Sequence, residues 1–158
     1  SHTVLNLPEI DVQRPAGTSI PDGGADNVGN HLWGTVILEY TICNLQGAQL
    51  TIPSGGVTAA NMINCSGFTV VTTLPLNIDA GNCVSLQISL NVTDHGPFSF
   101  DMDIANNDDD ENPYDIAVSG MGLAPEIDVQ RPAATSIADG GTDNVTIMIG
   151  RTKPREAP

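Results

Sequence analysis

A near-perfect internal repeat is the feature that most constrains this sequence. Residues 8–28, PEIDVQRPAGTSIPDGGADNV, return at 125–145 as PEIDVQRPAATSIADGGTDNV, and the copies differ only at Gly17/Ala134, Pro21/Ala138 and Ala25/Thr142. The offset of 117 residues (125 minus 8) exceeds any solenoid period and matches the size of one autonomous domain. The repeat predicts a leader at 1–7, one complete unit at 8–124 and the opening of a second unit at 125–158.

The second copy stops resembling the first after Val145, where residues 146–158 replace the sequence found at 29–40. Residues 125–149 still carry strand-forming sequence, whose backbone groups and apolar side chains need a sheet to pack against. We therefore expect this segment to connect subunits head to tail, using the apolar side chains of Ile127, Val129, Ile137, Ile147 and Ile149.

The charge balance excludes several classes of partner. The chain has 19 acidic and five basic residues, which gives a net charge of -14. Nucleic acid and anionic membrane surfaces are poor partners for such a protein. Three of the five cations, Arg151, Lys153 and Arg155, lie in the last eight positions and would be drawn to an acidic neighbour. No run of 18 apolar residues occurs, so we expect no membrane insertion.

Composition also bears on the cellular compartment. Residues 1–150 contain no lysine, and Thr, Ser, Asn and Gly are abundant. The chain has three cysteines, which is typical of an oxidising environment more than of a cytosolic enzyme. These features predict an extracellular or cell-surface protein.

Short apolar or alternating runs separated by Gly, Pro, Asn and Asp are typical of all-β proteins. No stretch shows a helical period, and 16 glycines and 11 prolines would interrupt most helices. The predicted strands are residues 9–13, 35–44, 49–52, 68–72, 76–78, 84–91, 98–105 and 114–120.

Alternation within three of these strands predicts which face enters the core. The inward sets are Val36, Leu38, Tyr40 and Ile42; Val84, Leu86, Ile88 and Leu90; and Phe98, Phe100, Met102 and Ile104. Two sheets that face each other across these rows form a β-sandwich.

Four segments carry a family resemblance. They are ICNLQGAQLTI at 42–52, GFTV at 67–70, AGNCVSLQI at 80–88, and IANNDDDENPYDIAVSGMG at 104–122. Together they resemble the Hydin-like (ASH) immunoglobulin fold, and specifically the choice-of-anchor D repeats of bacterial surface proteins. The resemblance covers residues 8–122. It implies a seven- to nine-strand sandwich in a long extracellular or cell-surface protein, and it implies no catalytic residues.

An acidic turn invites comparison with a calcium site, because clustered oxygen ligands suit that ion. Its members are Asp101, Asp103, Asn106, Asn107, Asp108, Asp109, Asp110 and Glu111, of which Asp101, Asp103, Asp108 and Asp110 are the candidate ligands. Their spacing does not fit an EF-hand. A solvated hairpin turn closed by Asn112 and Pro113 is the favoured interpretation, so we expect no metal or other cofactor.

The cysteines allow more than one pairing. If the strand that ends at 44 pairs antiparallel with the strand that starts near 83, Cys43 and Cys83 lie side by side on the outer face and can form a cross-strand disulfide. Cys65 is then free, although it could pair with either of the others.

Signatures of enzymes are missing. The sequence has no nucleophile elbow, zinc-binding helix motif or phosphate loop, and His2, His31 and His95 are scattered. Trp33 with His31 and Tyr40 could form a sugar-stacking platform, but a single Trp at a strand start is more often structural. We expect a structural subunit of a fibre or surface protein that binds copies of itself. The alternative is a ligand-binding or adhesin module followed by a truncated repeat.

Overall fold

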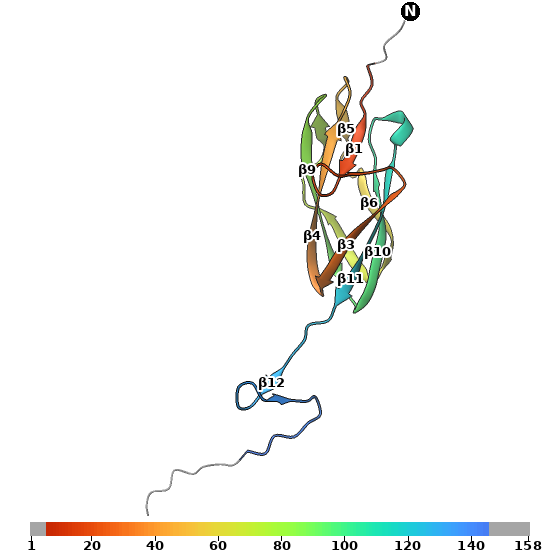
Figure 1. Cartoon of the computed structure of the whole chain (residues 1–158). Helices are drawn as coiled ribbons and strands as arrows, with labels where there is room; N and C mark the ends of the chain where they lie inside the picture. The colour runs from red at the N-terminus through yellow and green to blue at the C-terminus, as the bar shows by residue number, and fades with distance from the viewer. Residues whose placement is uncertain (1–5, 146–158) are drawn as a thin grey trace, which may run out of the picture. The chain divides into compact units, whose positions relative to one another are not determined.

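A computed structural model describes residues 6–145 of the chain. It divides into two compact units, one through Pro125 and one from Glu126 onward. The first unit is an all-β sandwich (Figure 1). The second contains the short strands β12 (Val129–Gln130) and β13 (Ser136–Ile137), which pair antiparallel. Within residues 6–145, no helix is long and apolar enough to cross a membrane.

One sheet of the sandwich has five strands. Its order is β2 (Ser19–Ile20), β1 (Ile10–Gln13), β4 (Gly34–Asn44), β9 (Cys83–Val92) and β7 (Cys65–Val70). All its neighbouring strands are antiparallel, and the longest ladder joins β4 to β9. Strand β1 therefore lies between its own hairpin partner β2 and the central strand β4.

The facing sheet has four strands in the order β3 (Gly24–Leu32), β11 (Tyr114–Leu123), β10 (Gly96–Ile104) and β6 (Val57–Ile63). Strand β3 is parallel to β11, and the other pairs are antiparallel. A small sheet of β5 (Leu50–Ile52) and β8 (Leu76–Ile78) and a 3-10 turn, η1 (Asp109–Glu111), complete the unit. The first copy of the repeat thus contributes strands to both sheets.

The core lies where the predicted rows meet. The inward sets of β4 and β10 are buried, and so are Leu86, Ile88 and Leu90 of β9, while Val84 is partly buried at the edge. The fold class and the faces of these strands are confirmed. Alternation predicted them because each strand buries one side only, so a period of two is written into its residues.

Two long strands are absent from the sequence prediction. Strand β3 is mostly polar, GADNVGNHL, and β6 is VTAANMI with Asn61 at a positive φ of 53°. Both are edge strands with an irregularity in their pairing. Edge strands bury little, so their sequences lack the apolar alternation on which the prediction depended.

The Gly-x-Gly ending of the unit has a steric cause. A Cβ at Gly120 would collide with the Phe98 ring, and a Cβ at Gly122 would collide with the Asp94 carbonyl oxygen. The two glycines let β11 lie close to the first residues of β10 and to the turn that precedes them.

Candidate functional site

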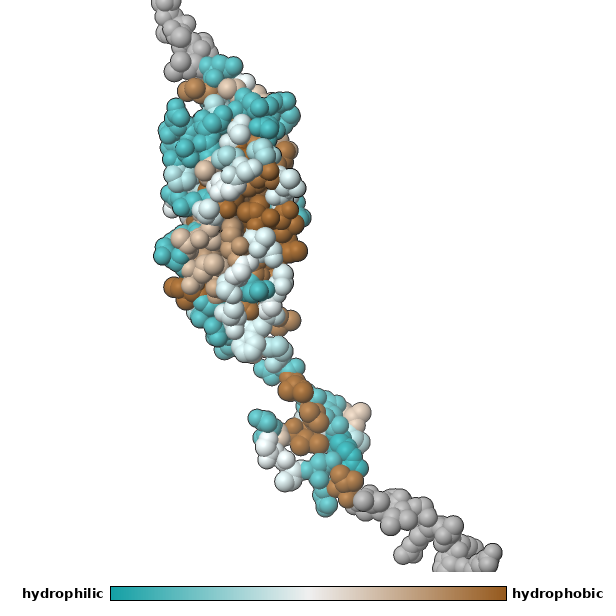
Figure 2. Space-filling view, turned by 180° about the vertical axis from the view of Figure 1, so that it is seen from behind, coloured by the Kyte–Doolittle hydropathy of each residue, from teal (hydrophilic) through white to brown (hydrophobic). Residues whose placement is uncertain are grey.

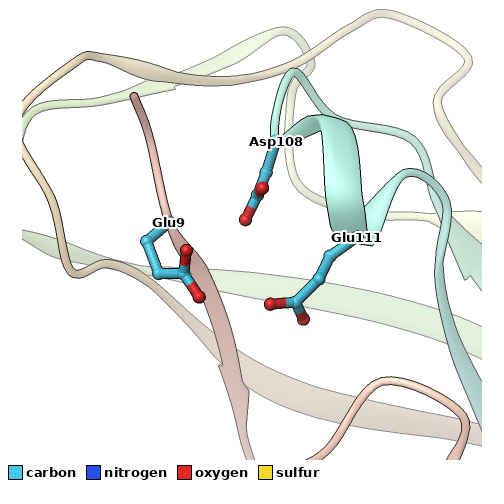
Figure 3. A group of neighbouring side chains, drawn as sticks. All are labelled: Glu9, Asp108 and Glu111. Carbon is cyan, nitrogen blue, oxygen red and sulfur yellow. The ribbon is translucent and has the colours of Figure 1, made fainter. Parts of the chain in front are cut away.

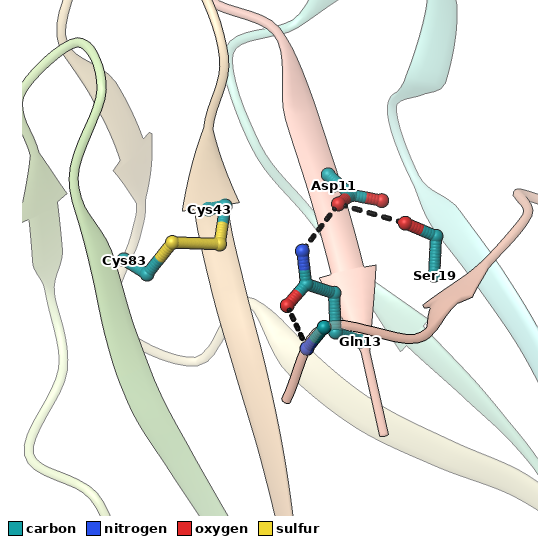
Figure 4. The surroundings of a disulfide bond; sticks show 6 residues. Asp11, Gln13, Ser19, Cys43 and Cys83 are labelled. Carbon is teal, nitrogen blue, oxygen red and sulfur yellow. Dashed lines mark hydrogen bonds between the residues drawn. A yellow bond between two sulfur atoms is a disulfide. The ribbon is translucent and has the colours of Figure 1, made fainter. Parts of the chain in front are cut away.

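The first copy, residues 8–28, folds its opening into a small hydrogen-bonded hairpin (Figure 4). Asp11 Oδ2 accepts hydrogen bonds from Gln13 Nε2 at 2.7 Å and from Ser19 Oγ at 2.9 Å. The Gln13 side chain in turn accepts the Gly17 N–H at 2.7 Å. These bonds span at most eight residues, so the hairpin needs only its own sequence.

The first copy pairs with β4 on the side opposite to β9. Ile10 is opposite Asn44, Val12 is opposite Ile42, and both apolar side chains are buried. At the start of the ladder, the Ile10 N–H donates to Asp108 Oδ2 at 3.0 Å. A side chain of the sandwich therefore accepts the hydrogen bond of a β1 backbone N–H at the first residue that pairs with β4.

A buried carboxylate joins the far end of the first copy to the core. Asp26, on β3, accepts a hydrogen bond from Tyr40 Oη at 2.9 Å, and the Arg14 guanidinium lies 3.3 Å from the same oxygen. Burial, reinforced by the Asp26 carboxylate, raises the pKa of Tyr40 above its usual range. The phenol is therefore a permanent donor, and it links β3 in one sheet to β4 in the other.

Strand β11 holds the same segment from the other side. Tyr114 Oη donates to the Ile20 carbonyl, and the Asp115 N–H donates to Asp22 Oδ1 at 2.7 Å. Burial raises the pKa of Tyr114 to about 12, so it also stays protonated. The first copy is thus held by contacts with both sheets.

The second copy, residues 125–145, has the same local structure. Ser136 Oγ donates to Asp128 Oδ2 at 3.0 Å, and the Ala134 N–H donates to Gln130 Oε1 at 2.7 Å. The Arg131 guanidinium pairs with Asp143 at 2.9 Å, which matches the pair formed by Arg14 and Asp26. The second copy therefore forms the same hairpin while its strand residues are exposed.

Burial separates the two copies. Ile10 and Val12 are 2% and 0% exposed, whereas the equivalent Ile127 and Val129 are 85% and 54% exposed. Figure 2 shows hydrophobic residues on the surface of the second unit. Ile137 is partly buried. The other two predicted interface residues, Ile147 and Ile149, lie outside the described residues.

A cluster of three carboxylates lies beside the start of β1 (Figure 3). Glu9, Asp108 and Glu111 point toward one another, with one oxygen of each within 4.8 Å of the others. Burial and the charges of Glu9 and Asp108 raise the pKa of Glu111 to about 7. Burial is also the main cause that raises the pKa of Asp108. Hard oxygen ligands of this kind suit calcium.

The four sequence-predicted calcium ligands do not form one group. Asp108 and its neighbour Asp110 lie at the turn, whereas Asp101 and Asp103 lie on β10. There Asp103 is opposite Asp115, and a hydrogen bond that protonated Asp115 donates to Asp103 raises the pKa of Asp115. These three β10 and β11 carboxylates line a surface depression of about 400 Å³.

The acidic turn is also less solvated than we predicted. Asn106 and Asp108 are buried, and Asn106 Nδ2 donates to the Ile104 and Glu111 carbonyls. The expectation of a solvated hairpin holds for the exposed Asn107, Asp109 and Asp110 but not for the whole turn, because the turn closes over the start of β1 and supplies its backbone with an acceptor. The sequence could not place Glu9 here, since it is about a hundred residues from Asp108.

Cys43 and Cys83 lie opposite each other on β4 and β9 and are joined in a disulfide (Figure 4). Both lie on the outer face of the sheet, as predicted: Cys83 is exposed, whereas Cys43 is buried because Asp11 and Cys83 flank it on the two neighbouring strands. Cys65 is free and buried, and burial raises the pKa of its thiol. That thiol is therefore poorly reactive.

The possible sugar-stacking platform is not assembled. Trp33 is 45% exposed, but Tyr40 is fully buried with its hydroxyl on Asp26. The His31 ring packs edge-on against Phe98, with ring centroids 6.2 Å apart. Alternation places Tyr40 in the core and Trp33 outside it, so the three rings cannot present one flat surface.

No protein-family model matches the sequence, and neither does any curated protein. Among solved structures, a protein of unknown function from Porphyromonas gingivalis W83 has a TM-score of 0.52 at 16% identity, covering 77% of this chain and 50% of that one. The secreted serine protease VesC from Vibrio cholerae has a TM-score of 0.50 at 12% identity, covering 64% and 22%. The ASH/PapD-like domain 7 of human CEP192 has a TM-score of 0.49 at 8% identity, covering 79% and 92%.

These likenesses show a fold and no more. The chain spans half or less of the first two proteins, so it corresponds to a part of each. The fold itself is the all-β sandwich described above, with a five-stranded sheet facing a four-stranded one.

Proposed function

We propose that this chain is a structural module of an extracellular or cell-surface protein, of the choice-of-anchor D kind that its motifs resemble, in which like sandwiches are joined head to tail through residues 125–145. One observation carries the proposal. The second copy is folded like the first but exposes Ile127 and Val129, whose equivalents the first copy buries. Exposed apolar strands of this kind mark an interaction surface.

The extracellular part of the proposal rests on the cysteines and the composition. A disulfide between Cys43 and Cys83 persists in an oxidising compartment and is rare in the cytosol. The acidic, lysine-poor surface agrees with that setting. Protease treatment of intact source cells tests it: an exposed module is degraded, whereas a cytosolic protein is spared until the cells are lysed.

The proposal assigns the chain no catalytic role. Its perturbed carboxyl groups, Glu111 and Asp108, surround the start of β1, and Asp108 accepts a backbone N–H there. Perturbed groups with a structural partner of this kind also occur in ion-pair and hydrogen-bond networks that do no chemistry.

A chain with a completed second unit tests the structural role. Residues 146–158 are replaced by another copy of 29–124, so that the second copy is followed by the sheets that hold the first. We expect the Ile127 amide to become protected from hydrogen exchange, as the Ile10 amide is through Asp108. The same protein with Val129→Asp is the control that should lose protection. Amides at 126–145 that still exchange freely in the completed protein would contradict the proposal.

A further inference from the structure

The structure shows which surface can bind the second copy, because the nearly identical first copy already pairs with strand β4. The first copy occupies the free side of β4, where Gln13 is opposite Thr41 and Val12 is opposite Ile42. The residues that make these contacts are the same in the second copy. Of the substituted positions, Gly17 has open space where a Cβ would be, so Ala134 causes no clash there.

Chain length prevents the second copy from using the β4 strand of its own sandwich. The Trp33 N–H donates to the Leu123 carbonyl at 3.2 Å, so β11 ends beside the Gly34 end of β4. The Ile10 position is at the opposite end of this 11-residue strand, about 30 Å away. Figure 1 shows β1 starting and β11 ending at opposite ends of the sandwich. From Leu123 to Ile127 the extended chain spans at most about 14 Å, so the strand must belong to another sandwich.

We infer that the second copy binds the β4 edge of another molecule of this chain, in the register of the first copy and in its place. This inference rests on the proposed function and names the partner. Ile127 then lies opposite Asn44 and Gln130 opposite Thr41 of the partner molecule. The Ile127 N–H donates to Asp108, and Asp143 accepts the Tyr40 hydroxyl.

Exchange requires that the partner release its own first copy. Each second copy that docks frees one first copy of almost the same sequence, so intact molecules gain little net burial. The resident segment also has the advantage of being attached to its own sandwich. Weakening the first copy of the acceptor, or raising the concentration of donor, therefore shifts the competition toward exchange.

Disulfide trapping in full-length chains tests the inference, with Cys65→Ser in every protein. The acceptor carries Thr41→Cys and Val12→Ala, and the donor carries Gln130→Cys. The two are mixed with donor in excess, unfolded in urea without reductant and refolded in a glutathione buffer. We expect a covalent dimer that forms about tenfold more than with an acceptor carrying Glu39→Cys, which is two residues out of register. Donor Val129→Asp should abolish the dimer.

The control is a single chain with Gln13→Cys and Thr41→Cys, which must close internally. If it closes and no donor–acceptor dimer forms, even with the milder acceptor that keeps Val12, the inference is overturned. An equal yield with Glu39→Cys would also overturn it, because the pairing would have no register. The head-to-tail part of the proposed function fails separately: it is refuted if the completed two-unit protein leaves residues 126–145 unprotected.

Discussion

The two copies of the repeat form the same hairpin, yet only one of them is buried. Asp11 and Asp128 each accept a hydrogen bond from the serine eight residues later, and each copy has an Arg–Asp pair. In contrast, Ile10 is buried between two sheets and Ile127 is open to solvent. Local sequence is therefore enough for the hairpin, while the strand contributes to stability only when a sheet receives it.

The largest expected difference concerns this isoleucine pair. Ile10→Ala leaves a cavity beside β4 and should lower the free energy of unfolding by about 2–5 kcal/mol. Ile127→Ala is at an exposed site and should change it by less than about 0.5 kcal/mol. Urea unfolding followed by tryptophan fluorescence measures both. Equal effects of the two substitutions would show that the second copy is already packed in the isolated chain.

The Arg–Asp pairs should separate next. Asp26→Asn weakens a buried acceptor shared by Tyr40 and Arg14 and should cost about 1–3 kcal/mol. Asp143→Asn removes the equivalent pair with Arg131, whose two side chains are 49% and 31% exposed, and should cost less than about 0.5 kcal/mol. The same urea titration applies. A large loss on Asp143→Asn would mean that this carboxylate has a further partner.

A smaller difference concerns the backbone at the hairpin turn. Gly17 has a φ of 94°, and its counterpart Ala134 is held at 76°. A side chain in this region is strained, so Gly17→Ala should cost about 1 kcal/mol of sandwich stability. Ala134→Gly should leave the unfolding midpoint unchanged but slow hydrogen exchange of the Thr135 amide. An unchanged midpoint for Gly17→Ala would show that the turn relaxes at no cost.

The smallest expected effect concerns pH, because solvent screens partly exposed carboxylates. The pKa of Glu111 rises from its ordinary value of 4.5 to about 7 on folding, mainly by burial. Between these values the folded chain binds more protons than the unfolded chain, so stability should fall as the pH rises from about 4.5 to 7. Glu111→Gln should flatten this part of the profile, and Glu126→Gln, in the second copy, is the control.

Adding calcium to the same unfolding experiment tests whether the carboxylate cluster binds a cation. A cation among Glu9, Asp108 and Glu111 would offset their repulsion, so it should raise the unfolding midpoint at pH 8 more than at pH 5. Glu111→Gln should remove that increment. Identical midpoints with calcium and with a chelator would assign the cluster a structural role alone.

Sequence reasoning predicted the parts of the fold whose residues alternate. Strands β4, β9 and β10 each bury one face, and their inward rows were identified from period alone. The pairing of β4 with β9 that places Cys43 opposite Cys83 also follows from an antiparallel immunoglobulin-like sheet. Strand β3 was not predicted, because its residues are mostly polar. It pairs with β11 through backbone hydrogen bonds, and its sequence shows no apolar alternation.

The candidate site was only partly visible in the sequence. The repeat marked residues 125–145 as a second copy and Ile127 and Val129 as its apolar strand residues, which the structure exposes. The carboxylate cluster was not predicted, because Glu9 and Asp108 meet only when β1 enters the ladder beside β4. Aspartates that are close in sequence, such as Asp103 and Asp108, were instead separated onto a strand and a turn.

The sequence by itself determined the hairpin of each copy, since its hydrogen bonds join residues within eight positions and form alike in both. Only the tertiary structure decided what each copy does with that hairpin. The bonds that hold the first copy join residues far apart in the chain, as between Ile10 and Asp108. Such contacts exist only where a folded sheet brings the partners together, so identical residues are a buried strand in one place and an exposed one in the other.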